Sequence, residues 1–87
     1  MANTVGGQLD EMAQLSKTFN TNGSQAQQIR SVIDRAMAGT TWTGPAADRF
    51  RDAWHQFSPS LDKLHEALVE AGREVEQRRR ALEQATS

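Results

Sequence analysis

The sequence predicts an all-α protein: an antiparallel helical hairpin with a Trp-x-Gly turn, whose copies pair into a four-helix-bundle dimer. Two observations predict this fold. Apolar residues recur in steps of three and four on both sides of a Trp-Thr-Gly turn near the middle of the 87-residue chain. The apolar face is about three positions in seven wide, more than a lone hairpin buries. We expect one domain over 1–87, with helix one at about 7–38, a turn at 39–44 and helix two at about 45–85.

Helix one is expected to begin near Gly7, because the pair Gly6-Gly7 disfavours helix before that point. Its first heptad phase has the apolar members Leu9, Met12, Phe19 and Ala26, with Ser16 and Gly23 as weak members. A phase shifted by one residue then carries Ile29, Ile33 and Ala36. The change falls in 21–24, a poor helix-forming stretch, where we expect a continuous but locally irregular helix. A real break there is the alternative.

The turn is predicted from the residues that favour helix ends. Gly39 can end helix one in a left-handed conformation. Pro45 suits the first turn of helix two, so Gly44 or Thr43 would be its N-cap. Trp42 is then left at the hinge between the helices.

Helix two has the clearer pattern, a long apolar seam that only Arg78 interrupts. The seam comprises Ala47, Phe50, Trp54, Phe57, Leu61, Leu64, Leu68, Ala71, Val75, Arg78, Leu82 and Ala85. One flank of the seam carries Arg51, Ser58, His65, Gly72 and Arg79, and the other is mostly small residues. Pro59 lies inside the pattern, where we expect a kink in a continuous helix; two separate helices are the alternative.

The expected core of the hairpin and of the dimer is a set of large apolar side chains from both helices. Its members are Phe19, Ile29, Ile33, Phe50, Trp54, Phe57, Leu61, Leu64, Leu68 and Val75. Helix one would end opposite about residue 77 of helix two. Residues 78–87 are therefore expected to form an exposed tail.

Composition excludes several classes of function. The chain has 10 Lys+Arg against 11 Asp+Glu, so a nucleic acid partner is not expected. No segment has the pattern of a Sec signal peptide or of an integral membrane span. The chain has no cysteine, and no motif indicates an enzyme, a cofactor, a metal site or a small-molecule substrate. Asp62, His65 and Glu66 share one turn of helix and are expected to form a solvated surface, a weak metal or acid/base site being the alternative.

This pattern resembles the WXG family of small helical-hairpin proteins, the early-secreted-antigenic-target (ESAT)-like substrates of type VII secretion. The resemblance covers nearly the whole chain. Residues 42–44 match the turn motif of the family, and Ala46, Ala47 and Phe50 are similar to its usual start of helix two. The segment around Pro59 is also similar to the family, which favours one long helix.

The resemblance implies a homodimer, or a heterodimer with a paralogous WXG protein. It also implies export without a Sec signal through a machine driven by an FtsK/SpoIIIE-type ATPase. In the family, the Trp-x-Gly turn and a C-terminal Tyr-x-x-x-Asp/Glu tail act together as the export signal. Trp42 and Gly44 supply the turn motif here. The chain has no tyrosine, and Arg79-x-x-x-Glu83 is the nearest tail match.

The predicted function is therefore that of a small protein made in the cytoplasm and secreted, folded and dimeric, by a type VII system. It would act as a substrate or a co-secreted partner. The alternative is a cytoplasmic adaptor or chaperone that is not exported and that shields another amphipathic helical protein.

Overall fold

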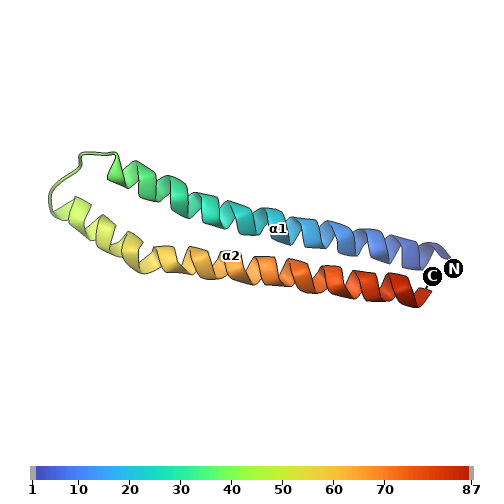
Figure 1. Ribbon diagram of the computed structural model, residues 1–87. Coiled ribbons are helices and arrows are strands. Elements are labelled where there is room, and N and C mark those ends of the chain that lie inside the picture. Colours follow the sequence, from blue (N-terminus) through green and yellow to red (C-terminus); the bar gives the residue numbers. More distant parts are fainter. Residues whose placement is uncertain (1, 87) are drawn as a thin grey trace.

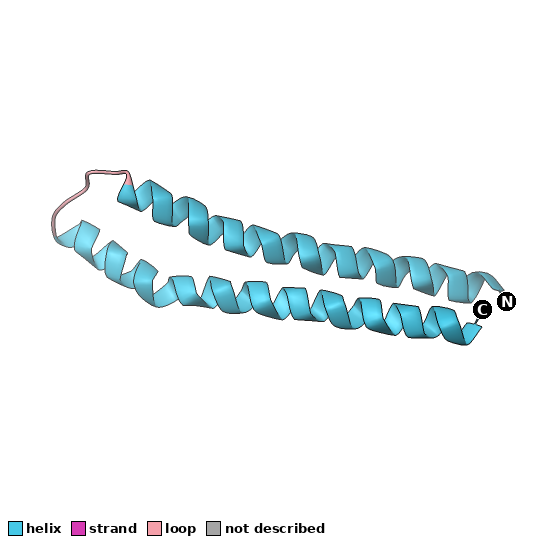
Figure 2. Cartoon of the chain, viewed as in Figure 1, coloured by secondary structure: helices cyan, strands magenta, loops and turns pink. Residues whose placement is uncertain are grey.

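The computed structural model describes residues 2–86; Met1 and Ser87, the ends of the predicted domain, lie outside that range. Two helices, α1 (Ala2–Ala38) and α2 (Pro45–Thr86), run antiparallel and side by side (Figure 1). The described part of the chain contains only these helices and the loop that connects them (Figure 2). Its overall shape is a rod of 66 × 16 × 15 Å. The predicted all-α hairpin is confirmed.

Helix α1 begins at Ala2, earlier than the predicted start near Gly7. Both Gly6 and Gly7 are helical and exposed. Two glycines disfavour helix by about 1 kcal/mol each relative to alanine. Packing along a neighbouring helix outweighs so weak a local preference. The segment 21–24 is also regular helix, so the predicted irregularity is absent there.

Gly44 is the residue on which the turn depends. Its φ of 108° lies in the left-handed region that side chains disfavour, and its carbonyl oxygen accepts the first helical hydrogen bond of α2 from Asp48 N at 3.0 Å. Gly44 is therefore the N-cap of α2. The left-handed conformation predicted for Gly39 is wrong: its N–H continues α1 by donating to Arg35 O at 2.9 Å. Thr40 Oγ1 then donates to Ala36 O at 2.7 Å, which satisfies a terminal carbonyl of α1.

Helix α2 runs continuously through Pro59, as predicted, and bends in the segment coloured yellow in Figure 1. Proline removes one backbone hydrogen bond and displaces the preceding turn, which explains a bend at this place. Because the helix is not broken, α2 remains beside α1 on both sides of the bend.

Two rows of α2 are turned towards α1, and only one of them belongs to the predicted seam. The shared row contains Ala47, Trp54, Leu61, Leu68, Val75 and Leu82, all buried or half-buried. The second row is the flank Arg51, Ser58, His65, Gly72 and Arg79. The remaining seam row carries Phe50, Phe57 and Leu64, and these three side chains are exposed rather than enclosed between the two helices. Of the core predicted for the hairpin and the dimer together, these three residues lie outside the interior of the hairpin, and their place in a dimer stays a prediction.

Helix α1 keeps one heptad phase along its whole length. Its less exposed side chains are Val5, Leu9, Met12, Ser16, Phe19, Gly23, Ala26, Arg30, Ile33 and Met37. The predicted phase shift is wrong, because Arg30 and Met37 continue the inward row where Ile29 and Ala36 were expected. Arg30 can occupy this row because its guanidinium forms an ion pair with Asp62 of α2.

The helices pack through small residues at mid-length. Ser16 and Ser58 are 6% and 2% exposed, and Ser16 Oγ donates to Gly72 O of α2 at 2.9 Å. A Cβ at Gly23 would lie 3.3 Å from Val69 Cγ2, and one at Gly72 would lie 2.7 Å from Asn20 Oδ1. The two backbones therefore approach closely because the inward rows carry serine, glycine and alanine.

The predicted exposed tail at 78–87 is wrong for its described part. The pairs Ser16–Gly72, Gly23–His65 and Asp34–Trp54 place residue n of α1 level with residue 88 minus n of α2. The early start of α1 therefore covers the end of α2, and both ends of the described chain meet at one end of the rod (Figure 1).

Gly72→Leu should lower the free energy of unfolding by about 1–3 kcal/mol, the usual effect of overpacking. A Cβ there would be 3.2 Å from Ser16 O as well as close to Asn20, so the helices must separate. Gly7→Leu is the matched control, because nothing lies within 4 Å of a Cβ at Gly7. It should raise the free energy of unfolding by up to about 1 kcal/mol through helix propensity. Urea denaturation measures both, and equal effects would contradict the close approach at Gly72.

Candidate interaction surface

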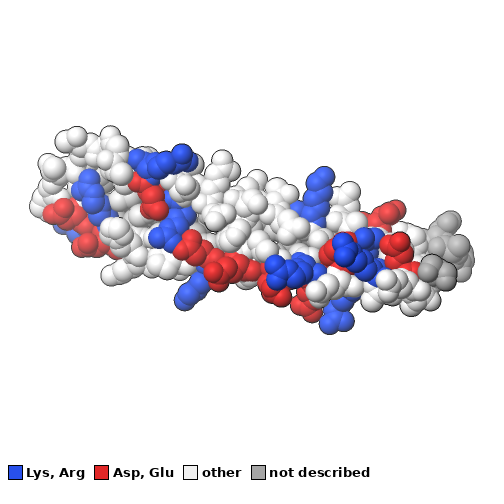
Figure 3. Space-filling model, in the orientation of Figure 1, with Lys and Arg blue, Asp and Glu red and all other residues white. Residues whose placement is uncertain are grey.

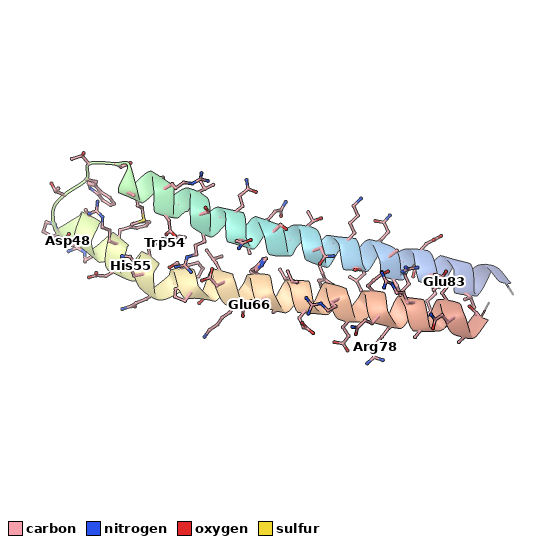
Figure 4. All side chains as sticks on the ribbon, in the orientation of Figure 1. Asp48, Trp54, His55, Glu66, Arg78 and Glu83 are labelled. Atoms are coloured by element: carbon pink, nitrogen blue, oxygen red, sulfur yellow. The ribbon has the colours of Figure 1, made fainter. Side chains whose placement is uncertain are left out.

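One side of the hairpin is bridged by polar contacts between the helices. Trp54 Nε1 donates to Asp34 Oδ1 at 2.7 Å, and Arg30 forms ion pairs with Asp34 and Asp62. Figure 4 shows Trp54 in the half of the rod that ends at the turn. We call the side that carries these contacts the bridged face. It ties α1 to α2 with charged and aromatic side chains near the turn.

The ionisable residues of the possible metal or acid/base site do not converge. Asp62 pairs with Arg30, whereas His65 Nδ1 lies 2.7 Å from Gly23 O, a distance at which the ring nitrogen donates to the carbonyl. Glu66 is exposed. Within residues 2–86, no group of His, Asp or Glu side chains is arranged to hold a metal ion.

The large apolar side chains that the hairpin leaves exposed define a second surface, which we call the open face. On α2 it comprises Phe50, Phe57 and Leu64, which are 47%, 55% and 48% exposed. On α1 it comprises Leu15, Ile29 and Val32, which are 44%, 51% and 45% exposed.

Helix geometry places these six residues on the same side of the rod. Successive residues turn by about 100° around a helix. On α2, Asp62 follows the inward Leu61 by one residue and reaches the bridged face, so Leu64, three residues after Leu61, lies on the opposite side. On α1, Asp34 follows Arg30 by four residues towards the bridged face, and Ile29, one residue before Arg30, lies opposite. Because α1 and α2 are antiparallel, the side of α1 that carries Ile29 and the side of α2 that carries Leu64 face the same way.

The open face is an exposed apolar surface rather than an enclosed cavity. On α1 it includes a shallow groove lined by Gln25, Gln28, Ile29, Val32 and Ile33. A contiguous exposed apolar area on a small protein marks a site that binds another macromolecule.

Trp42 stands at the end of the rod in the turn. It is 45% exposed, and its ring centroid lies 6.0 Å from that of Phe50. Aromatic rings at this separation attract each other. The contact joins the turn motif to the open face, while leaving almost half of the indole accessible.

Comparison with known families decides the identity. The model of a family described as proteins of 100 residues with WXG, WXG100, matches residues 6–87. The chain belongs to the WXG100 family. This is the ESAT-like family of type VII secretion substrates. No curated protein and no solved structure matches the chain.

The WXG100 motif has a clear structural basis in this chain. Its glycine is Gly44, whose left-handed φ of 108° and capping carbonyl start α2. Its tryptophan is Trp42, held by Phe50. The motif therefore fixes the turn through glycine and presents a half-exposed indole at the tip.

At the other end of this WXG100 hairpin, the candidate tail residues Arg79 and Glu83 lie in a network of charges. Arg79 Nη1 donates to Glu83 Oε2 at 3.0 Å, and Arg79 Nη2 donates to Glu76 Oε1 at 2.6 Å. The Arg79 side chain is 23% exposed, whereas that of Glu83 is 57% exposed. Figure 4 shows Glu83 at the end of the rod where the chain termini meet.

The network changes the acidity of its central carboxylate. Hydrogen bonds from Arg79 and the charge of that guanidinium lower the pKa of Glu76 to about 2 from an ordinary 4.5, although partial desolvation opposes them; Arg80 lowers it further. The same contacts raise the pKa of Arg79. Both groups are therefore charged over the whole physiological range.

The charged surface is mixed in sign. Figure 3 shows Lys and Arg alternating with Asp and Glu along α2, without a large area of one charge on the side in view. Neither helix has an apolar stretch that could cross a membrane within the described residues.

Sequence reasoning found the turn and the large apolar residues but missed the contacts that orient them. The sequence pattern does not place Gly72, Ser58 and His65 between the helices, because the larger apolar residues of the neighbouring seam are the expected core. The signal was present: Ser16 and Gly23 recur at heptad spacing on helix one, as Ser58 and Gly72 do on helix two.

Glu76→Gln should reduce the acid sensitivity of the hairpin. Because the folded-state pKa is lowered, the stabilisation from ionised Glu76 is complete above about 4.5 and is lost as pH falls towards about 2. Wild-type Tm should therefore fall more steeply over this interval than the Tm of the variant. Circular dichroism melts at several pH values measure the difference. Glu66→Gln, at an exposed position of α2, is the control and should keep the wild-type slope.

Proposed function

We propose that this WXG100 protein is exported folded, as a dimer of hairpins, by a type VII secretion system. Its cytoplasmic partner would be the FtsK/SpoIIIE-type ATPase that drives the system. The observation that carries the proposal is the turn, where Gly44 fixes the backbone and Trp42 remains 45% exposed at the tip. A motif held in one conformation and left accessible can be recognised without unfolding of the hairpin.

The open face supports the dimeric part of the proposal. Six large side chains are each about half exposed, and burying the remainder contributes about 1 kcal/mol for each of them. The interior of the hairpin is poor in large residues, with Ala26, Ala47 and Leu61 as its buried apolar side chains in the described residues. A second hairpin on the open face would supply the apolar burial that the single hairpin lacks, whether it is a second copy or a paralogous WXG protein.

Of the two parts of the proposed export signal, the tail matches the family motif less completely than the turn does. In the nearest match to the tail motif, Arg79-x-x-x-Glu83, an arginine takes the place of the tyrosine, and its guanidinium is held by Glu76 and Glu83. Glu83 remains accessible near the end of the rod where the two chain ends meet, and it supplies the acidic residue of the motif. We propose Glu83 as the tail contact of this chain, with any aromatic contribution coming from a partner.

Trp42→Ala should reduce export by more than its loss of stability accounts for. Truncating a half-exposed tryptophan should cost about 1–2 kcal/mol, below the ~3–5 kcal/mol of a fully buried one. The helices should persist, because Trp42 lies outside both inward rows. The measurement is the ratio of culture supernatant to cell pellet in a host with the type VII ATPase and in one without it, together with the Tm of the purified variant.

Thr41→Ala is the matched control, because it changes a neighbouring exposed turn residue and keeps Trp42. It should be exported like the wild type. Normal export of Trp42→Ala would remove the recognition role of the indole. Retention of the wild-type protein in cells that possess the ATPase would favour the cytoplasmic adaptor instead.

A further inference from the structure

The pair Asn22-Gly23 carries a chemical reactivity that the proposed function does not use. In a flexible chain, the backbone nitrogen of the residue after an asparagine can attack the carboxamide carbon of that asparagine. Glycine favours the attack, because it has no side chain to hinder the approach and its backbone turns freely. Asn20, two residues earlier, precedes Thr21, whose branched side chain hinders the same reaction. Asn22 is therefore the more reactive of these two asparagines.

In the folded hairpin, α1 holds Asn22 away from this reaction. The backbone of residues 22 and 23 is helical, so the N–H of Gly23 takes part in the hydrogen-bonded ladder of the helix. The exposed side chain of Asn22 is directed back along the helix, because its Nδ2 donates to Thr18 O at 2.8 Å. The carboxamide is thus held on the preceding helical turn, whereas the nitrogen that would attack it belongs to the following residue.

Contacts with α2 keep this part of α1 helical. Residues 20–24 are asparagine, threonine, asparagine, glycine and serine, all of them weak helix formers. On α2, His65 Nδ1 lies 2.7 Å from Gly23 O, and Gly72 O accepts a hydrogen bond from Ser16 Oγ at 2.9 Å. The protection of Asn22 therefore depends on the packing of the hairpin rather than on the local helix preference.

We propose that Asn22-Gly23 is a modification site at which deamidation is blocked in the folded hairpin and proceeds when α1 opens, and that the isoaspartate product cannot return to the fold. The proposal does not depend on export.

The reaction needs only water and a base. In the open chain, the backbone nitrogen of Gly23 loses its proton to solvent and forms a bond to Asn22 Cγ. The bond between Cγ and Nδ2 breaks, Nδ2 takes up a proton and leaves as ammonia, and a cyclic imide remains. Water then adds to one of the two carbonyl carbons of the imide and breaks its bond to nitrogen. The product is aspartate or isoaspartate at position 22, with no change of oxidation state.

The isoaspartate product does not fit between the helices. Its main chain passes through Cγ and is longer by a methylene group, directly before a residue that is packed against α2. At Gly23 there is little room for the backbone to shift, because a Cβ there would lie 3.3 Å from Val69 Cγ2 and 3.4 Å from His65 O. A transient opening of α1 would in this way become a permanent loss of the folded state.

Deamidation of the full-length chain tests the proposal. The protein is incubated at mildly alkaline pH, either folded in buffer or unfolded in guanidinium chloride, and positions 20 and 22 are followed by peptide mass spectrometry. In the unfolded chain, Asn22 should convert well before Asn20. In the folded hairpin, the conversion of Asn22 should be at least about tenfold slower, since a packed helix is open in only a small fraction of molecules. Equal conversion of Asn22 in the two states would overturn the proposal, as would conversion of Asn20 as fast as that of Asn22 in the unfolded chain.

Two histidine variants test the part played by α2 under native conditions. His65→Ala removes the ring nitrogen beside Gly23 O and should speed the conversion of Asn22 by up to about tenfold, the effect of one lost hydrogen bond on the open fraction. If this variant does not fold, its rate should equal that of the unfolded chain. His55→Ala is the matched control, because it changes an exposed histidine of α2 and should convert at the wild-type rate. Equal rates in the two variants would contradict protection by the hairpin.

Refolding of the isolated product tests the second half of the proposal. The isoaspartate species, separated by ion exchange, should fail to regain the helical circular dichroism signal when denaturant is removed. Asn22→Asp is the matched control, because it has the same additional charge at an exposed position and keeps the normal backbone. It should refold with a Tm close to that of the wild type. Refolding of the isoaspartate species to the wild-type Tm would overturn the proposal that this product is excluded from the fold.

Discussion

The close approach of α1 and α2 at mid-length determines the rest of this structure. Ser16 and Gly72 share a hydrogen bond, a Cβ at Gly72 would lie only 2.7 Å from Asn20 Oδ1, and one at Gly23 would be in tight contact with Val69. At Gly23 and Gly72 only a small residue fits between the helices, whereas larger residues such as Phe19 are half-buried beside them. Phe50 and Phe57 lie outside the two inward rows of α2, and together with Leu64 they form an exposed apolar surface on one side of the rod.

This constraint explains which parts of the fold the sequence predicts. The backbone preferences of Gly44 and Pro45 do not depend on distant contacts, so the sequence alone predicts the turn and the start of α2. Long heptad patterns identify the two helices, and a proline on the outer surface does not interrupt α2. Which row faces inward depends on the contact between helices, and the row of Ser58 and Gly72 competes with that of Phe57 and Leu64. A rule that ranks residues by hydrophobicity turns the row of Phe57 and Leu64 inward, whereas close packing of the two backbones turns the row of Ser58 and Gly72 inward.

The ends of the helices show a related limit. Two glycines predict a late start of α1 from local preference alone, yet the neighbouring helix extends α1 to Ala2. With that extension, the end of α2 is no longer a free tail, and Arg79 takes an inward position opposite Leu9. Arg79, whose position gives the nearest match to the family tail motif, stabilises the hairpin end through its ion pairs with Glu76 and Glu83.

The dimensions of the rod bear on how such a protein can move through a confined passage. Its cross-section is 16 × 15 Å, against a length of 66 Å. Adding a second hairpin on one side widens one short dimension by about 10 Å, the usual spacing between packed helices, and leaves the other unchanged. A channel that admits the pair lengthwise must therefore be about 10 Å wider in one direction than one that admits a single hairpin. Passage lengthwise would put either the tryptophan turn or the chain ends first, so orientation at the entrance becomes part of transport.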